Sequence, residues 1–110
     1  LVVTPVPIIS GAVVSCRPVG VLRMSDEQGE DSKVLAVPTE KLCMLFREVR
    51  APEHLSPVLL DQIRHFFEHY KDLEPGKWVK VRGWEGAAAA EQEILNAVQR
   101  YRDAAGAEQA

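Results

Sequence analysis

The first 24 residues are a run of β-branched and aliphatic side chains that prolines and glycines interrupt at short intervals. Val and Ile favour strands, and the breakers between them mark turns. Parallel neighbours need a crossover of a dozen or more residues, and no such segment separates these strands. The sequence therefore predicts strands within residues 1–24 of a mostly antiparallel sheet. Because Pro5 and Pro7 cannot donate to a ladder, we expect residues 4–7 at an edge or a bend.

The rest of the chain predicts further strands and two helices. The order of these elements is several strands, then a helix, a strand and a helix. This order indicates an α+β protein or a small barrel with helices outside. We expect one domain, residues 1–110, because this length is usual for one domain. The expected elements are a hairpin loop at 25–32, a returning strand at 33–37, irregular chain at 39–56 with a helical turn at 41–46, a helix at 57–73, a strand at 78–82, a turn at 83–86, a helix at 87–105 and a frayed tail at 104–110.

The helix expected at 57–73 has a clear start and a clear apolar side. Ser56 supplies a capping hydroxyl and Pro57 suits the first helical position. At about 100° per residue, its apolar side chains fall within an arc of about 140°, which we predict to face the core. These residues are Leu59, Leu60, Ile63, Phe66, Phe67, Tyr70 and Leu73.

Charge and cysteine content exclude several classes of protein. The chain has 13 Lys and Arg against 16 Asp and Glu, a net charge of −3, which argues against nucleic-acid binding through a basic face. No uncharged apolar run approaches the roughly 18 residues of a membrane span, and no signal peptide precedes the first strand-like segment. Two cysteines are too few for a disulfide scaffold. We therefore expect a cytoplasmic protein with neither nucleic-acid nor membrane partners.

An acidic loop is the first candidate site. Asp26, Glu27, Glu30 and Asp31 surround Gly29 in the expected hairpin. Oxygen-only ligands at a turn suit a hard cation such as Mg²⁺, and a hairpin would bring Asp26 and Asp31 close together. The spacing differs from that of a calcium-binding hand. The alternative is a solvated hairpin tip.

Three further residues are candidates for anion binding. Lys33 lies two residues after Asp31, so both point to one face of a strand. Such a pair suits a site that holds metal on one side and phosphate on the other. Tyr70 and Lys71 lie near the end of the expected helix, where a hydroxyl and an ammonium can reach a shared cavity. The alternatives are a surface ion pair for Lys33 and a packed Tyr70 whose oxygen reaches water.

A zinc-protease pattern occurs by sequence alone. His65, Glu68 and His69 match H-x-x-E-H, and the two imidazoles are one helical turn apart. The match has three fixed letters, and the three side chains point away from the apolar arc. We therefore prefer an interface or a solvated face for them.

Three blocks together resemble the soluble family I inorganic pyrophosphatases of bacteria. They are CRPVGVLRMSDEQGEDSKVLAVP (residues 16–38), HFFEHYKDLEPGKWVKVRGWEG (residues 65–86) and the alanine-rich closing helix with Glu93-Ile94-Leu95. The resemblance covers nearly the whole chain in the same order. It implies a distorted, five-stranded, OB-like antiparallel barrel flanked by helices. It also implies hydrolysis of inorganic diphosphate to two phosphates with several Mg²⁺ ions.

The resemblance also implies roles for the candidate residues. Aspartates that match Asp26 and Asp31 bind Mg²⁺, while a lysine that matches Lys33, and a tyrosine and a lysine that match Tyr70 and Lys71, contact phosphate. These weak candidates therefore merge into one expected site. The H-x-x-E-H match becomes an accident of the family's helix.

The family's acidic signature, D-x-D-P-x-D, precedes a segment like the first residues of this chain and is absent from it. The portion of the family's chain that carries this signature also contains two more metal-binding aspartates, the general base, several phosphate contacts and the first strands of the barrel. We therefore expect a C-terminal portion that holds no catalytic base and is inactive alone. An OB-like binding module and a non-catalytic structural remnant are the rival interpretations.

The family resemblance further implies a homo-oligomer, a hexamer in the full-length protein. The sequence offers a candidate surface, because His65, Glu68 and His69 lie opposite the apolar arc, with Asp72 within reach of His69. Such a face can be buried against a neighbouring subunit. The alternative is a solvated polar face.

Overall fold

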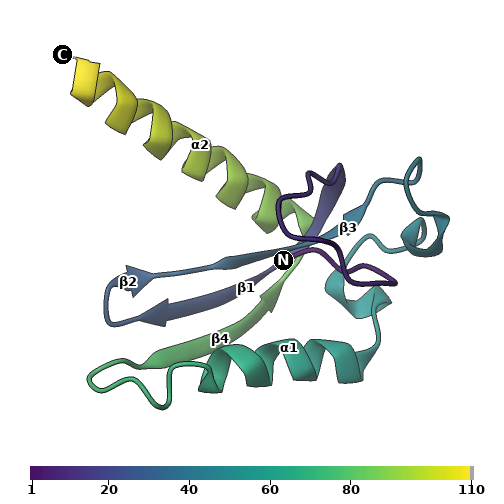
Figure 1. Cartoon of the computed structure of the whole chain (residues 1–110), viewed down its shortest axis with the longest axis horizontal. Helices are drawn as coiled ribbons and strands as arrows, with labels where there is room; N and C mark the ends of the chain where they lie inside the picture. Colours follow the sequence, from purple (N-terminus) through teal and green to yellow (C-terminus); the bar gives the residue numbers. More distant parts are fainter. Residues whose placement is uncertain (110) are drawn as a thin grey trace.

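The computed structural model describes residues 1–109, and Ala110 lies outside the described residues. A long central strand, β1 (Cys16–Asp26), pairs on one side with β2 (Gly29–Glu30) and β3 (Lys33–Pro38), and on the other side with β4 (Val79–Glu85). All three pairings are antiparallel, as the sequence predicts. Figure 1 shows two helices with this sheet, α1 (Pro57–His69) alongside β4 and α2 (Ala87–Gln109) extending away.

The sheet is open. Within the described residues, β3 and β4 each pair with β1 and not with each other. The outer edge of β3 meets the start of the chain through a single parallel bridge between Val2 and Ala36. A closed barrel needs more strands than these four provide. The described residues therefore do not form the OB-like barrel that the resemblance implies.

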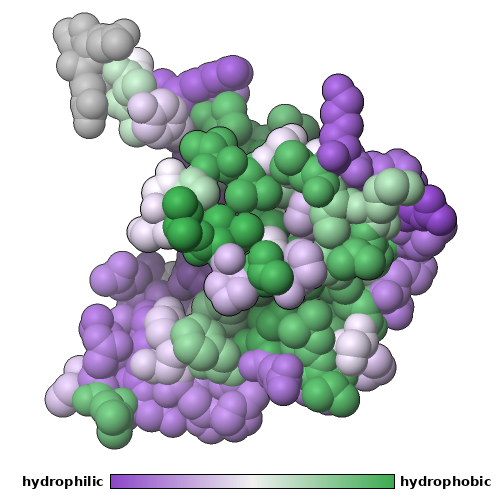
Figure 2. Space-filling model, turned by 45° about the vertical axis from the view of Figure 1, so that its right-hand side comes forward, coloured by the Kyte–Doolittle hydropathy of each residue, from purple (hydrophilic) through white to green (hydrophobic). Residues whose placement is uncertain are grey.

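The prediction of strands before β1 is wrong apart from the bridge at Val2. Residues 4–15 form no strand in the described structure. Pro5 and Pro7 lack the N–H groups that a ladder needs, and this segment is largely uncovered, with Val13 99% exposed. Figure 2 shows apolar side chains gathered on the face of the molecule that this view presents. The Val and Ile residues within residues 4–15 therefore have no partner strand within the described chain.

The core lies between the sheet, α1 and the segment that joins them. That segment contains the helical turn expected at 41–46, which is the 3₁₀ turn η1 (Met44–Phe46), and a second 3₁₀ turn, η2 (Pro52–His54). The guanidinium of Arg17 holds the segment against β1 by donating to the carbonyls of Phe46, at 2.8 Å, and Val49. The buried core residues are Val19, Leu35, Val37, Val49 and Leu55, with Leu60 and Ile63 of α1 packed against them.

Helix α1 begins where predicted and ends earlier. Pro57 occupies the first turn, but in this described region the Ser56 hydroxyl makes no capping hydrogen bond, and the Ser56 carbonyl accepts from Leu60 at 3.2 Å. The helix ends at His69, and Leu73 is 97% exposed. The predicted core face is therefore correct only in the first half of the helix.

Two other boundaries differ from the prediction. Strand β4 continues to Glu85, so the turn predicted at 83–86 is wrong. Gly83 has φ +139°, next to an irregularity in the pairing with β1 at Arg23 and Met24, and this conformation is one that glycine tolerates. Helix α2 continues to Gln109 through most of the expected tail. Within the described range, neither helix is both long and apolar enough to cross a bilayer.

Candidate active site

The hairpin formed by β1, β2 and β3 carries two of the acidic candidates, Asp26 and Asp31, on one face. Gly29 has φ +119°, which lets the chain reverse directly after Asp26. Asp31 then lies opposite Met24 and donates its backbone N–H to the Met24 carbonyl at 3.0 Å. Because side chains alternate along a strand, Asp26, Asp31 and Lys33 share one face of the hairpin. The predicted juxtaposition of these three residues thus follows from the register.

Lys71 reaches this face from the turn after α1. Its Nζ lies 2.8 Å from Oδ2 of Asp26 and 3.5 Å from Oε1 of Glu27. The Lys71 and Asp26 side chains are only 12% and 10% exposed. Asp26 Oδ1 accepts the backbone N–H of Gln28 at 2.9 Å. An ammonium and two carboxylates are therefore held together in a mostly buried position.

These contacts set the charge of the group. The hydrogen bond from Lys71 lowers the pKa of the Asp26 carboxyl, and the N–H of Gln28 lowers it further. The same hydrogen bond raises the pKa of the Lys71 ammonium. Backbone hydrogen bonds from its own N–H and from that of Trp78 lower the pKa of Glu27. All three side chains are thus ionised at neutral pH.

A second ion pair lies on the same face. Nζ of Lys33 is 2.7 Å from Oδ1 of Asp31, and both side chains are about one-third exposed. Nζ of Lys33 also lies 5.7 Å from the centre of the Phe67 ring of α1, within reach of a cation–π contact. Helix α1 therefore forms one wall beside the lysine.

Aromatic rings connect the two ion pairs. The Phe67 ring meets the Tyr70 ring edge-on at 5.7 Å, and Nζ of Lys71 lies 5.6 Å from the centre of the Tyr70 ring. Tyr70 is 41% exposed, which leaves part of it facing water. All five predicted site residues, Asp26, Asp31, Lys33, Tyr70 and Lys71, therefore belong to one connected surface.

Sequence reasoning missed two members of this surface. Glu27 was noted in the acidic loop but not singled out, and its contact with Lys71 is what distinguishes it from Glu30, whose carboxylate pairs with Arg82. Phe67 was placed among the core residues because of its helical spacing. No signal in the sequence shows that its ring lies between Lys33 and Tyr70.

The carboxylates have the chemistry that Mg²⁺ prefers. Mg²⁺ keeps several waters in proteins and is held by one or two carboxylates together with substrate phosphates. Asp26 and Asp31 supply such oxygen donors on one face of the hairpin. Among the described residues, no group of three or more His, Cys, Asp or Glu side chains is arranged to hold a metal ion. Asp26 and Asp31 thus have donor atoms of a type that fits Mg²⁺.

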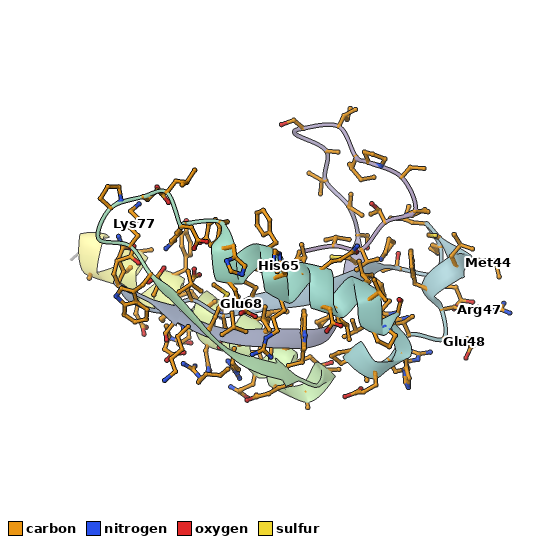
Figure 3. All side chains as sticks on the ribbon, turned by 90° about the horizontal axis from the view of Figure 1, so that it is seen from below. Met44, Arg47, Glu48, His65, Glu68 and Lys77 are labelled. Atoms are coloured by element: carbon orange, nitrogen blue, oxygen red, sulfur yellow. The ribbon has the colours of Figure 1, made fainter. Side chains whose placement is uncertain are left out.

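The H-x-x-E-H residues do not assemble a metal site in the described part of the chain. The rings of His65 and His69 lie 4.4 Å apart, but Glu68 pairs with Arg64 at 2.8 Å and Nδ1 of His69 lies 2.9 Å from Oδ2 of Asp72. His65 and Glu68 lie on α1 at the surface (Figure 3). The preference for a surface role over a zinc site is therefore consistent with the structure.

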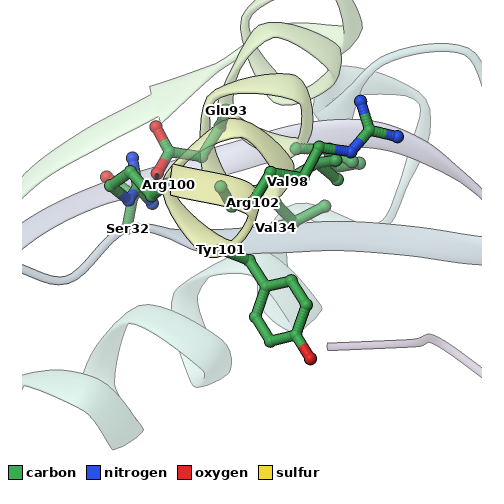
Figure 4. A pocket seen from close by; sticks show the side chains of 9 residues that line it. Ser32, Val34, Glu93, Val98, Arg100, Tyr101 and Arg102 are labelled. Carbon is green, nitrogen blue, oxygen red and sulfur yellow. Dashed lines mark ion pairs between the residues drawn. The ribbon is translucent and has the colours of Figure 1, made fainter. Parts of the chain in front are cut away.

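The opposite face of the hairpin anchors α2. Arg23 of β1 bonds Glu85 of β4 at 3.1 Å and Glu93 of α2 at 3.0 Å. Beyond this anchor, a cavity of about 560 Å³ opens between α2 and β3, lined in part by Val34 and Tyr101 (Figure 4). Strand alternation puts Ser32, which lines it, on the other face from Asp31 and Lys33. This cavity is therefore separate from the charged cluster.

Comparison with known proteins identifies a family for this chain. The family model described as inorganic pyrophosphatase matches residues 1–102. The inorganic pyrophosphatase of Yersinia pestis is 58% identical over 102 residues, which cover 93% of this chain and 58% of that protein. The inorganic pyrophosphatase of Pseudomonas aeruginosa is 55% identical over 102 residues, with the same two coverages.

Solved structures show the same similarity. The inorganic pyrophosphatase from Helicobacter pylori has a TM-score of 0.88 and 45% identity, covering 93% of this chain and 60% of that one. The enzyme from Thermus thermophilus has a TM-score of 0.85 and 39% identity, covering 93% and 59%. These matches define one class of protein. The chain belongs to the inorganic pyrophosphatase family, as its sequence motifs indicated. It spans 58% of the length of the two curated relatives named above.

Proposed function

We propose that this chain supplies part of the active site of an Mg²⁺-dependent enzyme that hydrolyses inorganic diphosphate to two phosphates. The observation that supports this most directly is the pairing of carboxylates and ammonium groups on one face of the hairpin. Asp26 meets Lys71 at 2.8 Å and Asp31 meets Lys33 at 2.7 Å. Carboxylates suit the metal ions and ammonium groups suit the anionic substrate. Membership of the family supplies the reaction.

The residues divide the work by charge. Diphosphate is strongly anionic, so a nucleophile approaches it against repulsion unless nearby cations neutralise the phosphate oxygens. Lys33 and Lys71 would provide such cations, and the Tyr70 hydroxyl would donate a hydrogen bond to the same group. Asp26 and Asp31 would hold Mg²⁺. Bound Mg²⁺ would contribute charge neutralisation and a water acidified toward hydroxide.

The proposed reaction also needs groups outside this chain. No residue of the described cluster is assigned as the general base, which is expected in the family's D-x-D-P-x-D signature. We propose that the OB-like barrel, too, is completed by strands that the longer relatives contain. Accordingly, the chain alone should hydrolyse no diphosphate above background.

The proposed oligomeric state and cellular location of the complete protein rest on its family membership. The complete protein would be a cytoplasmic hexamer, with the outer face of α1 at a contact between subunits. That face carries His65, Glu68 and His69, and the His69–Asp72 pair at 2.9 Å holds two of its polar groups together. Polar groups already paired in this way can be buried against a neighbour at lower cost.

The test is phosphate release from diphosphate in the presence of Mg²⁺. Two proteins are compared: the 110-residue chain, and a chimera in which residues 1–102 replace the matching segment of the Yersinia pestis relative. We expect the chimera to turn over diphosphate and the chain alone to be inactive. A folded chimera without activity would favour a structural remnant. Binding of single-stranded nucleic acid or oligosaccharide by such a chimera would favour the OB-like binding module.

A further inference from the structure

The ammonium of Lys71 lies against the carboxylates of Asp26 and Glu27. Its Nζ is 2.8 Å from Oδ2 of Asp26 and 3.5 Å from Oε1 of Glu27, so one positive charge bridges two neighbouring carboxylates. All three side chains are mostly buried. At these positions water screens the attraction less than at an open surface. The two carboxylates thus already hold a cation that is part of the chain.

The remaining carboxylate oxygens point to backbone donors. Oδ1 of Asp26 accepts the N–H of Gln28 at 2.9 Å, and Oε2 of Glu27 accepts the N–H of Trp78 at 3.4 Å. These amides belong to the hairpin turn and to the entry of β4, and they do not move independently of the fold. A second cation that approaches the carboxylates therefore meets the oxygens that Lys71 occupies. Binding directly to Oδ2 of Asp26 requires that the ammonium leave or shift.

We propose that the Lys71 ammonium competes with a divalent cation for the carboxylates of Asp26 and Glu27. When the cation displaces it, the ammonium becomes free to bind an anion. The identity of the cation as Mg²⁺ and of the anion as phosphate or diphosphate rests on the proposed function. The competition itself rests on the contacts of Lys71 with Asp26 and Glu27. Before cation binding the ammonium is engaged by the carboxylates, and afterwards it carries an unsatisfied charge beside Tyr70.

Competition of this kind couples the two ligands. If the cation releases Lys71, an anion that binds Lys71 makes the carboxylates easier for the cation to occupy. By linkage the cation strengthens anion binding by the same factor. Couplings in proteins commonly amount to about 5- to 150-fold in affinity. The Lys33–Asp31 pair repeats the arrangement with greater exposure, so we expect weaker competition there.

The experiment measures Mg²⁺ affinity by isothermal titration calorimetry, with and without inorganic phosphate. It uses the 110-residue chain and, in parallel, the chimera. Lys71→Gln removes the competing charge, Lys71→Arg keeps a charge at this position, and Lys77→Gln is the matched control. Lys77 pairs with Glu74 at 3.3 Å, and both side chains are about half exposed. Circular dichroism compares the folding of each variant with that of the unmodified protein.

Without phosphate, we expect Lys71→Gln to bind Mg²⁺ at least about fivefold more tightly than the unmodified protein. Lys71→Arg and Lys77→Gln should stay close to it. Phosphate should strengthen Mg²⁺ binding in the unmodified protein and have little effect in Lys71→Gln. Equal or weaker Mg²⁺ binding by Lys71→Gln, or no Mg²⁺ binding by any of the proteins, would overturn the proposal.

A second measurement needs no variant to fold. In the unmodified protein, Mg²⁺ alone should shift the NMR signal of the Lys71 Cε methylene, and an unmoved signal at saturating Mg²⁺ also overturns the exchange. The two proposals can fail separately. An inactive chimera in which Mg²⁺ still displaces Lys71 removes the proposed function and leaves the exchange. An active chimera whose Mg²⁺ affinity is the same with and without the Lys71 ammonium removes the exchange and leaves the proposed function.

Discussion

Nζ of Lys71 lies 2.8 Å from Oδ2 of Asp26, although 45 residues separate the two in the sequence. The pair fastens the turn after α1 to the last residue of β1. This contact contributes to the stability of the fold as well as to the candidate site. Its loss should therefore be visible without any ligand.

Acid should weaken the fold in metal-free buffer. The hydrogen bond from Lys71 lowers the pKa of Asp26 in the folded chain. A carboxyl of this kind stabilises the fold above its unfolded pKa of about 3.9, and the contribution disappears as the pH falls through the lower, folded pKa. Urea unfolding between pH 6 and pH 2.5 should show this loss, and Asp26→Asn should lack this part of it. Asp61→Asn, at an exposed position on α1, serves as the control and should keep the full acid response.

Asp31→Asn should nearly abolish turnover by the chimera, lowering kcat by at least about 100-fold. If Asp31 holds a metal beside the attacking water, the neutral amide would hold that metal less well, and a metal in such a place contributes several kcal/mol to hydrolysis. Phosphate release at saturating Mg²⁺ measures the effect, with Asp61→Asn as the control. Activity like that of the unmodified chimera would remove Asp31 from the site.

Asp26→Asn should change the Mg²⁺ requirement more than the chemical step. If Asp26 holds a metal that arrives with the substrate, the variant needs a higher Mg²⁺ concentration for half-maximal rate and recovers much of its kcat when Mg²⁺ saturates. The measurement is the rate as a function of Mg²⁺ at fixed diphosphate. An unchanged Mg²⁺ dependence would count against this role.

Gly20→Ala should destabilise the fold by about 1–3 kcal/mol. A Cβ at this buried position of β1 would lie 3.0 Å from the Glu85 carbonyl oxygen and would overlap the ring of Pro52. Neither the backbone of β4 nor the proline ring in η2 can move aside without disturbing the sheet. Chemical denaturation measures the effect. Gly106→Ala in α2, where nothing lies within 4 Å of the new methyl, should cause no loss.

The outer face of α1 should influence assembly. Nδ1 of His69 lies 2.9 Å from Oδ2 of Asp72 on this face. If the face meets another subunit, His69→Gln and Asp72→Asn should alter the oligomer size of the chimera. Analytical ultracentrifugation provides the measurement. Identical behaviour of both variants and the unmodified chimera would place the face in solvent.

Local signals in the sequence predicted the elements that depend on neighbouring residues. The hairpin follows from Gly29 between two strand-forming segments, and the start of α1 follows from Pro57. The end of β4 was missed because Gly83 reads as a turn residue, whereas the irregular pairing opposite Arg23 gives it a place inside the strand. Leu73 was assigned to the core because spacing reveals a helical face but not the length over which that face is covered.

Only part of the candidate site could be predicted from the sequence. The alternation of Asp31 and Lys33 predicts their shared face, since both belong to one strand. Contacts between distant segments are different, because nothing local specifies that Lys71 meets Asp26 or that Phe67 lies between Lys33 and Tyr70. The family resemblance named Asp26, Lys33, Tyr70 and Lys71 together, but not Phe67. The structure adds that each lysine is paired with a carboxylate.

Helix α2 is attached to the sheet at one end only. Ala90 is buried and Glu93 bonds Arg23, and past these residues the helix extends away from the strands (Figure 1). Its later turns are held chiefly by their own backbone hydrogen bonds, which open readily in water when tertiary packing is absent. Amide protons along α2 should therefore exchange with deuterium in a graded order. The label enters first at the C-terminal turns and last beside Ala90.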